Sequence, residues 1–180
     1  MKILNNFKTD ASLIVNFGEG DASAFEVLYA RHKNTLFNYV FRQLPTPSDA
    51  EEVAQEIWMA VIRQATHYKH EASFKSWLFS IAFRRCADWW RKQHPEHSDD
   101  ELDSISSENN TDLEQQRLEQ EVTRALKTLP DEQRQTFMLR QEGFSYAEIA
   151  NMTESSSETV KSRLRYAKNS LQALLGEDHD

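Results

Sequence analysis

The chain of 180 residues is poor in the residues that cross-link, interrupt or anchor a fold. It has one cysteine, four glycines and four prolines. The single cysteine, Cys86, excludes an intramolecular disulfide, and the N-terminal stretch lacks the apolar core of a signal peptide. No apolar run approaches the roughly 20 residues that are needed to cross a bilayer. These absences predict a cytoplasmic protein without membrane insertion.

Segments in which apolar and polar residues alternate, as they do in strands, are also scarce. Apolar residues instead recur at helical spacing along most of the chain, as at Val53, Ile57, Ala60 and Val61. The sequence therefore predicts an all-α fold. It contains no Gly-rich phosphate loop and no nucleophile elbow, which argues against an enzyme, a cofactor or a small-molecule substrate.

Four histidines form two HxxH pairs, His67 with His70 and His94 with His97. The pairs flank a predicted helix of about 20 residues, and a helix of that length spans about 30 Å. Pairs so far apart cannot share one ion, and neither pair has a carboxylate or cysteine at a recognisable ligand spacing. We therefore expect no metal site.

The charge of the chain is unevenly distributed. The formal net charge is −8, and residues 98–119 contain eight acidic side chains and one basic side chain. This segment has few large apolar residues, so burial cannot offset the entropy lost on ordering it. We expect two small helical domains, residues 1–97 and 120–180, joined by a flexible acidic linker, residues 98–119. With a negative net charge, any DNA binding requires local basic faces.

The stretch from Ser145 to Leu175 predicts a short helix, a tight turn and a longer helix. Ser145 with Glu148, and Ser155 with Glu158, have the spacing of a capping box, which marks two helix starts. The longer helix combines a basic, amide-rich face with an apolar stripe, the pattern of a helix-turn-helix DNA reader. The stripe consists of Val160, Leu164, Ala167, Leu171 and Leu174.

Two further segments lie in residues 1–97. Ser48 with Glu51 marks the start of a helix whose outer face carries Glu52, Gln55, Glu56, Met59 and Arg63. Taken alone, that face is typical of a solvated surface. Ser73 is the expected N-cap of the next helix, in which Phe74, Leu78 and Ile81 form a core stripe.

The rest of that helix interleaves tryptophans with cations. Trp89 and Trp90 lie between Arg85 and Arg91, and this arrangement suits single-stranded nucleic acid, since bases stack on rings while cations follow phosphates. From spacing alone, tryptophans packed in the core with arginines on the solvated surface are as well supported as nucleic-acid binding. The alternatives stay open at the level of sequence.

The order of these segments resembles the extracytoplasmic-function (ECF) group of bacterial RNA polymerase sigma factors. The matching motifs are, in order, AFEVLYARH, DAEEVAQEIW, ASFKSWLFSIAFRRCADWWRK, ALKTLPDEQRQTFMLR, SYAEIA and TVKSRLRYAKNSL. The resemblance implies a promoter-specificity subunit that binds core RNA polymerase, through its beta-prime clamp and beta flap, and opens promoter DNA. It also implies control by an anti-sigma factor, in a stress or envelope response.

The resemblance also implies three sets of site residues. A polymerase-binding set lies on the DAEEVAQEIW helix, a minus-ten set lies on the following loop and helix, and a minus-thirty-five set lies on the TVKSRLRYAK helix. The polymerase-binding set is Asp49, Glu52, Gln55, Glu56 and Met59; the minus-ten set is Lys69, Phe74, Lys75, Trp77, Arg84 and Arg85; the minus-thirty-five set is Lys161, Ser162, Arg163, Arg165, Tyr166 and Lys168.

Three positions depart from the family pattern. Glu154 and Glu158 stand where glycine is usual, and Thr153 replaces an apolar residue. The two glutamates add negative charge beside the expected DNA-reading helix. A conventional helix-turn-helix regulator with an N-terminal sensing domain is the alternative function, although it leaves the Trp- and Arg-rich segment without a role.

Overall fold

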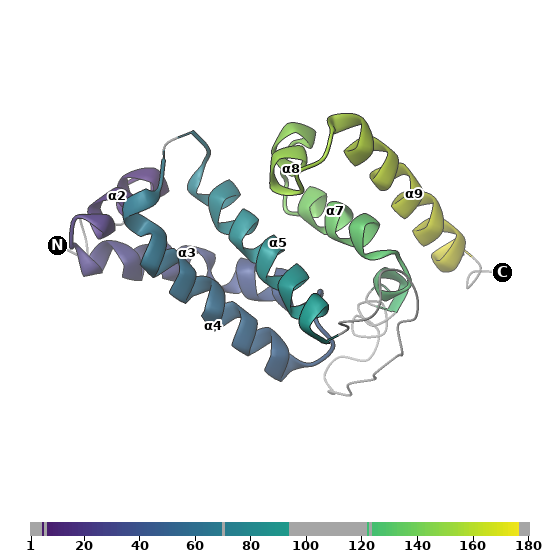
Figure 1. The fold of residues 1–180 in the computed structure, drawn as a ribbon, viewed down its shortest axis with the longest axis horizontal. Helices are drawn as coiled ribbons and strands as arrows, with labels where there is room; N and C mark the ends of the chain where they lie inside the picture. Colours follow the sequence, from purple (N-terminus) through teal and green to yellow (C-terminus); the bar gives the residue numbers. More distant parts are fainter. Residues whose placement is uncertain (1–4, 6, 70, 94–121, 123, 177–180) are drawn as a thin grey trace. The chain divides into compact units, whose positions relative to one another are not determined.

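The computed structural model describes residues 5, 7–69, 71–93, 122 and 124–176. All regular structure within these residues is helical, which confirms the predicted all-α class (Figure 1). The chain divides into two compact units, Met1–Pro95 and Glu96–Asp180.

The N-terminal unit is a bundle in which consecutive helices pack on one another. Its elements are α2 (Asp10–Gly18), α3 (Ala22–Phe41), α4 (Pro47–Gln64), the 3₁₀ helix η1 (Ala65–His67) and α5 (Phe74–Gln93). The core is aliphatic and aromatic, and the predicted inner face of α4 is buried within it, with Ile57, Ala60 and Val61 fully covered. The lone thiol, Cys86, is also buried, on α5.

The start of α4 differs from the sequence prediction. The cap is Thr46, not Ser48: the Thr46 hydroxyl accepts a hydrogen bond from the Asp49 backbone N–H at 3.2 Å and donates one to the Asp49 carboxylate at 2.5 Å. Pro47 then occupies the first helical position, where its missing N–H costs nothing and its fixed φ suits the helix. The helix therefore begins two residues earlier than the capping-box spacing indicated.

A carboxylate joins α2 to α3. Asp10, in the first turn of α2, lies 2.6 Å from the Arg31 guanidinium and 2.7 Å from His32 Nε2, both of which belong to α3. The hydrogen bond with His32 contributes most to lowering the pKa of Asp10 below its ordinary value, and Arg31 adds to the effect. Because these partners are about 21 residues away along the chain, no helical spacing rule could predict them.

The lowered pKa of Asp10 makes the stability of the N-terminal unit dependent on pH. A carboxyl whose pKa is lower in the folded state stabilises the fold above its unfolded pKa of 3.8 and ceases to do so as the pH falls through the folded value. We expect Asp10→Asn to cost about 1 kcal/mol of unfolding free energy near neutral pH, and to make the decline below about pH 4 smaller than in the wild type. Denaturant unfolding followed by tryptophan fluorescence measures both effects.

Asp88→Asn is the matched control, because Asp88 pairs with Arg91 one turn away on the exposed surface of α5. That change should alter the unfolding free energy by less than about 0.5 kcal/mol. Equal acid sensitivity of the wild type and Asp10→Asn would show that the contact between α2 and α3 does not carry the effect.

The C-terminal unit contains α7 (Asp131–Gln141), α8 (Tyr146–Met152) and α9 (Ser157–Gly176), and residues 124–127 form a helical turn before α7. Helix α9 packs on both α7 and α8. Val160, Ala167 and Leu171 are buried as the predicted stripe required, whereas Leu164 is only half-buried and Leu174 is exposed. The buried stripe therefore ends one turn earlier than its spacing indicated.

Candidate nucleic-acid and protein interfaces

Helix α8 begins with the predicted capping box. The Ser145 hydroxyl accepts a hydrogen bond from the Glu148 backbone N–H at 3.2 Å, and the Glu148 carboxylate accepts one from the Ser145 N–H at 2.8 Å. Two backbone donors at the start of the helix are thereby satisfied. The short first helix of the helix-turn-helix is fixed at its N-terminus by these two side chains.

The cap of α9 lies one residue beyond the predicted one. The Ser156 hydroxyl accepts from the Thr159 backbone N–H at 3.1 Å, whereas Ser155 pairs through its hydroxyl with Thr153 at 2.8 Å. The predicted box of Ser155 with Glu158 is therefore wrong, and the Glu158 carboxylate is directed to Lys161 instead, at 2.8 Å.

The turn between α8 and α9 places a non-glycine residue in the left-handed region. Glu154 has φ 51°, and no other non-glycine residue in the described part of the chain has positive φ. The Ser155 N–H donates to the Ala150 carbonyl at 3.0 Å, which closes a Schellman-type helix end around Glu154. A non-glycine residue in this conformation lowers the folding stability by on the order of 1 kcal/mol relative to glycine. The turn nevertheless keeps the geometry that glycine would favour.

The outer face of α9 carries most of the cations expected from the sequence. Lys161, Arg165 and Lys168 are exposed, and the Arg165 guanidinium lies 5.1 Å from the Tyr166 ring centroid. Tyr166 is itself exposed. The Ser162 hydroxyl donates to the backbone carbonyl of Glu158 at 3.0 Å, so its polar group is already used within the helix.

Arg163 lies apart from that face. Its side chain is 19% exposed and forms an ion pair with Glu132 in the first turn of α7. Arg163 therefore ties α9 to α7 and leaves the other cations to face outward. Sequence reasoning missed Glu132 as a partner, because the two residues are 31 positions apart and no local spacing links them.

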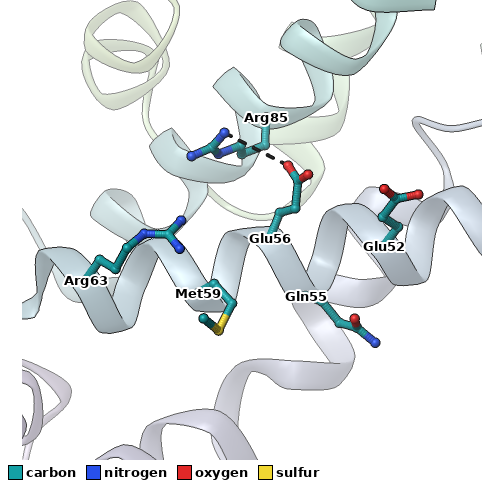
Figure 2. A pocket seen from close by; sticks show the side chains of 6 residues that line it. All are labelled: Glu52, Gln55, Glu56, Met59, Arg63 and Arg85. Atoms are coloured by element: carbon teal, nitrogen blue, oxygen red, sulfur yellow. Dashed lines mark ion pairs between the residues drawn. The ribbon is translucent and has the colours of Figure 1, made fainter.

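In the N-terminal unit, the outer face of α4 forms a shallow hollow (Figure 2). Met59 is 50% exposed in it, and the other side chains that line the hollow are polar or charged. Arg85 reaches over from α5 and approaches Glu56, with 3.9 Å between the guanidinium and the carboxylate. The residues that line the hollow are Glu52, Gln55, Glu56, Met59, Arg63 and Arg85.

A second hollow adjoins the first near the start of α4. Asp49 lies in it together with Glu52, Glu56 and Trp89. The structure thus brings the whole polymerase-binding set expected from the resemblance onto one side of α4. Neighbouring side chains of α5, including Arg85, line the same two hollows.

Three aromatic rings cluster at the start of α5. The Trp77 ring centroid lies 5.4 Å from that of Tyr68 and 6.0 Å from that of Phe74. The Tyr68 hydroxyl donates to the Ala72 carbonyl at 2.7 Å, which holds the segment before α5 in place. The Ser73 hydroxyl accepts from the Ser76 N–H at 3.0 Å, as the predicted cap requires.

The rings differ in exposure. Phe74 is 1% exposed, as its core spacing predicted, and packs against Tyr68 and Trp77. Contact of its ring with DNA stays a prediction, which this burial does not favour. Trp77 is half-buried, which leaves part of its ring accessible. Lys69 and Arg84 are exposed nearby, and the Lys75 ammonium lies 5.6 Å from the Phe79 ring centroid.

The tryptophans at the end of α5 have a structural role. Trp90 Nε1–H donates to the Gln43 carbonyl at 3.1 Å, which anchors the end of α5 to the connection between α3 and α4. Trp89 packs edge-on against Trp90 with 5.0 Å between ring centroids. For Trp90, the choice that spacing left open is therefore decided in favour of packing.

The described residues contain no group of three or more His, Cys, Asp or Glu side chains that could hold a metal ion. His70, His94 and His97, which belong to the HxxH pairs, lie outside these residues. No described helix combines the length and the apolar character of a membrane span.

Comparison with known proteins matches each of the two units to a region of the sigma-70 family. Residues 28–96 match the family model for sigma-70 region 2, and residues 119–171 match that for sigma-70 region 4. The ECF RNA polymerase sigma factor SigM of Mycobacterium tuberculosis is 31% identical over 172 residues, which cover 94% of this chain and 86% of SigM. The ECF RNA polymerase sigma-E factor of Escherichia coli K12 is 28% identical over 178 residues, covering 91% and 92% of the two chains.

Solved structures show the same fold. CnrH, in complex with the cytosolic domain of CnrY, aligns with a TM-score of 0.75 at 24% identity, over 95% of this chain and 99% of CnrH. The sigma factor RpoE of Bartonella quintana, in complex with the anti-sigma factor NepR, aligns with a TM-score of 0.69 at 24% identity, over 86% and 98% of the two chains. Since the relatives match along both units, the chain belongs to the family of ECF RNA polymerase sigma factors.

Proposed function

We propose that this chain is an alternative sigma factor, which binds core RNA polymerase and directs initiation at a specific set of promoters. The observation that carries the proposal is the family match across both units, with 94% of the chain aligned to a curated ECF sigma factor. Sigma factors are initiation factors without catalytic activity of their own. The chain accordingly needs no cofactor and would act on DNA inside the cytoplasm.

The first part of the proposal concerns polymerase binding by residues 1–97. The candidate surface is the exposed side of α4 with Asp49, Glu52, Gln55, Glu56 and Met59. A half-exposed methionine within a polar rim is the composition of a protein interface, where an apolar anchor is enclosed by hydrogen-bonding groups. The beta-prime clamp is the partner that the family relationship favours, and the beta flap is the corresponding partner of residues 120–180.

The second part concerns the minus-ten element. Trp77 presents an accessible ring on a rigid aromatic base formed by Tyr68 and Phe74. An unstacked base can pack on such a ring while nearby cations neutralise phosphates. We therefore assign Trp77 to base stacking, and Lys69, Lys75, Arg84 and Arg85 to the backbone of the non-template strand.

The third part concerns the minus-thirty-five element. Helix α9 offers Lys161, Arg165, Tyr166 and Lys168 on its exposed side, and a helix of this kind fits the major groove. Arg163 holds the helix against α7 through Glu132 and is a positioning residue in this scheme. The acidic residues 98–119 join the two domains.

Regulation by an anti-sigma factor is also part of the proposal. CnrH was solved with the cytosolic domain of CnrY, and RpoE of Bartonella quintana was solved with the anti-sigma factor NepR. A protein of that class, which covers the polymerase-binding or DNA-binding faces, is the regulator we expect. Co-purification of a stable complex that blocks polymerase binding would support it.

The test of the proposal is a reconstituted holoenzyme with matched variants of α4. We expect the wild-type chain to direct core polymerase to start transcription at a defined subset of a genomic promoter library. Gln55→Arg places a bulky charge within the binding face and should weaken polymerase affinity about tenfold or more. Competition against a labelled sigma factor measures this affinity.

Gln64→Arg is the control, since Gln64 is also exposed on α4 but does not line the hollow. It should bind polymerase as the wild type does. An equal loss of polymerase affinity in both variants would show that this face of α4 is not the polymerase-binding surface. Sequence-specific duplex binding without any polymerase-dependent transcript would favour a conventional regulator.

A further inference from the structure

The DNA-reading helix carries an acidic side chain at an unusual place. Glu158 is the second residue of α9, and its side chain is 82% exposed. Capping of the helix is supplied by Ser156, so the Glu158 carboxylate is not needed there. Its described partner is Lys161, one turn further along, at 2.8 Å. The pair raises the pKa of the Lys161 ammonium.

The position of this pair matches the part of a recognition helix that reads DNA. In helix-turn-helix proteins the N-terminal residues of the second helix contact base edges in the major groove. Residues spaced three apart lie on the same side of a helix, so Glu158 and Lys161 enter the groove together. Arg165 and Lys168 lie further along and suit phosphates.

A carboxylate at that point discriminates strongly between bases. Ionised glutamate only accepts hydrogen bonds, and most atoms on the floor of the major groove are acceptors too. The major-groove edge of cytosine itself offers only the N4 amino donor, whereas that of adenine places N7 beside its N6 donor. Guanine and thymine carbonyls repel the carboxylate. The ammonium of Lys161 has the opposite preference and suits the O6 and N7 acceptors of guanine.

We infer that Glu158 is a specificity-determining residue that selects cytosine at one position of the upstream promoter element, with Lys161 selecting guanine at an adjacent position. This inference rests on the proposed function, because it requires α9 to read the upstream element within a polymerase complex. Without a matching cytosine, the carboxylate keeps Lys161 as its partner and adds negative charge between the phosphate strands. The same residue that reduces general DNA affinity therefore sharpens the choice of promoter.

The experiment is selection from promoter DNA with a randomised upstream element, using holoenzyme assembled from the full chain and core polymerase. Wild type should enrich cytosine about tenfold at one position. Glu158→Gln replaces the acceptor pair with a donor and an acceptor, which suits adenine N6 and N7, so the preference should move from cytosine to adenine. Glu158→Gly should retain binding and lose the preference.

Glu154→Gln is the matched control, since it removes the same charge from the turn before α9 rather than from the helix. It should leave the cytosine preference intact. If Glu158→Gln and Glu158→Gly raise affinity for all sequences equally, the glutamate acts only by general repulsion and the inference is overturned. If wild-type holoenzyme enriches no upstream sequence at all, the proposed function itself fails, which is a different result.

Discussion

Phe74→Ala is expected to destabilise the N-terminal unit by about 3–5 kcal/mol, the range for removing a fully buried aromatic ring. Phe74 is 1% exposed and supports Trp77 and Tyr68, so its loss leaves a cavity beneath the aromatic cluster. Denaturant unfolding followed by tryptophan fluorescence measures the change, because all four tryptophans belong to this unit.

Phe74→Leu separates packing from DNA contact. Leucine keeps much of the buried volume, and we expect it to cost about 1 kcal/mol and to leave promoter opening intact. If Phe74→Ala were instead as stable as the wild type and failed to open promoters, the ring would be a DNA contact after all. The burial of Phe74 would then have to change in the complex.

Trp77→Ala is expected to slow promoter opening roughly tenfold to a hundredfold, because stacking of one base on an aromatic ring contributes about 1–3 kcal/mol. The ring of Trp77 is half-buried, so the loss of stability should be smaller than for Phe74→Ala. Open-complex formation, followed by the reactivity of unpaired bases in the minus-ten element, measures the effect.

Two controls accompany that variant. Trp77→Phe keeps a stacking surface and should restore most of the opening rate. Affinity for core polymerase should be unchanged in both variants, since Trp77 does not line the hollows on α4. If a folded Trp77→Ala variant opens promoters at the wild-type rate, stacking of a base on the Trp77 ring is not needed for promoter opening.

The helices themselves were predictable from residue spacing, because the buried apolar residues recur with the period of an α-helix. The buried face of α4 and three residues of the α9 stripe, Val160, Ala167 and Leu171, show this. Local capping chemistry was predictable in part: Ser145 and Ser73 cap the helices as expected. At α4 and α9 several hydroxyl residues compete within a few positions, and spacing alone does not choose between them.

Contacts between helices were not predictable in the same way. The pair of Arg163 with Glu132, like the link from Asp10 to α3, joins residues that only the packing of helices brings together. Spacing also does not tell how much of a ring remains accessible. Phe74 and Trp77 are one turn apart on α5, yet one is core and the other offers a partly open surface.

The burial of Cys86 gives the N-terminal unit a built-in chemical reporter. Its thiol is the only one in the sequence and is 1% exposed, so an alkylating reagent can reach it mainly when the unit opens. The rate of labelling, read as one mass increment on this chain, reports that opening even in the presence of polymerase and DNA. Any partner that binds only the closed unit must slow the labelling, and the logarithm of the rate falls in proportion to the stability that the partner adds.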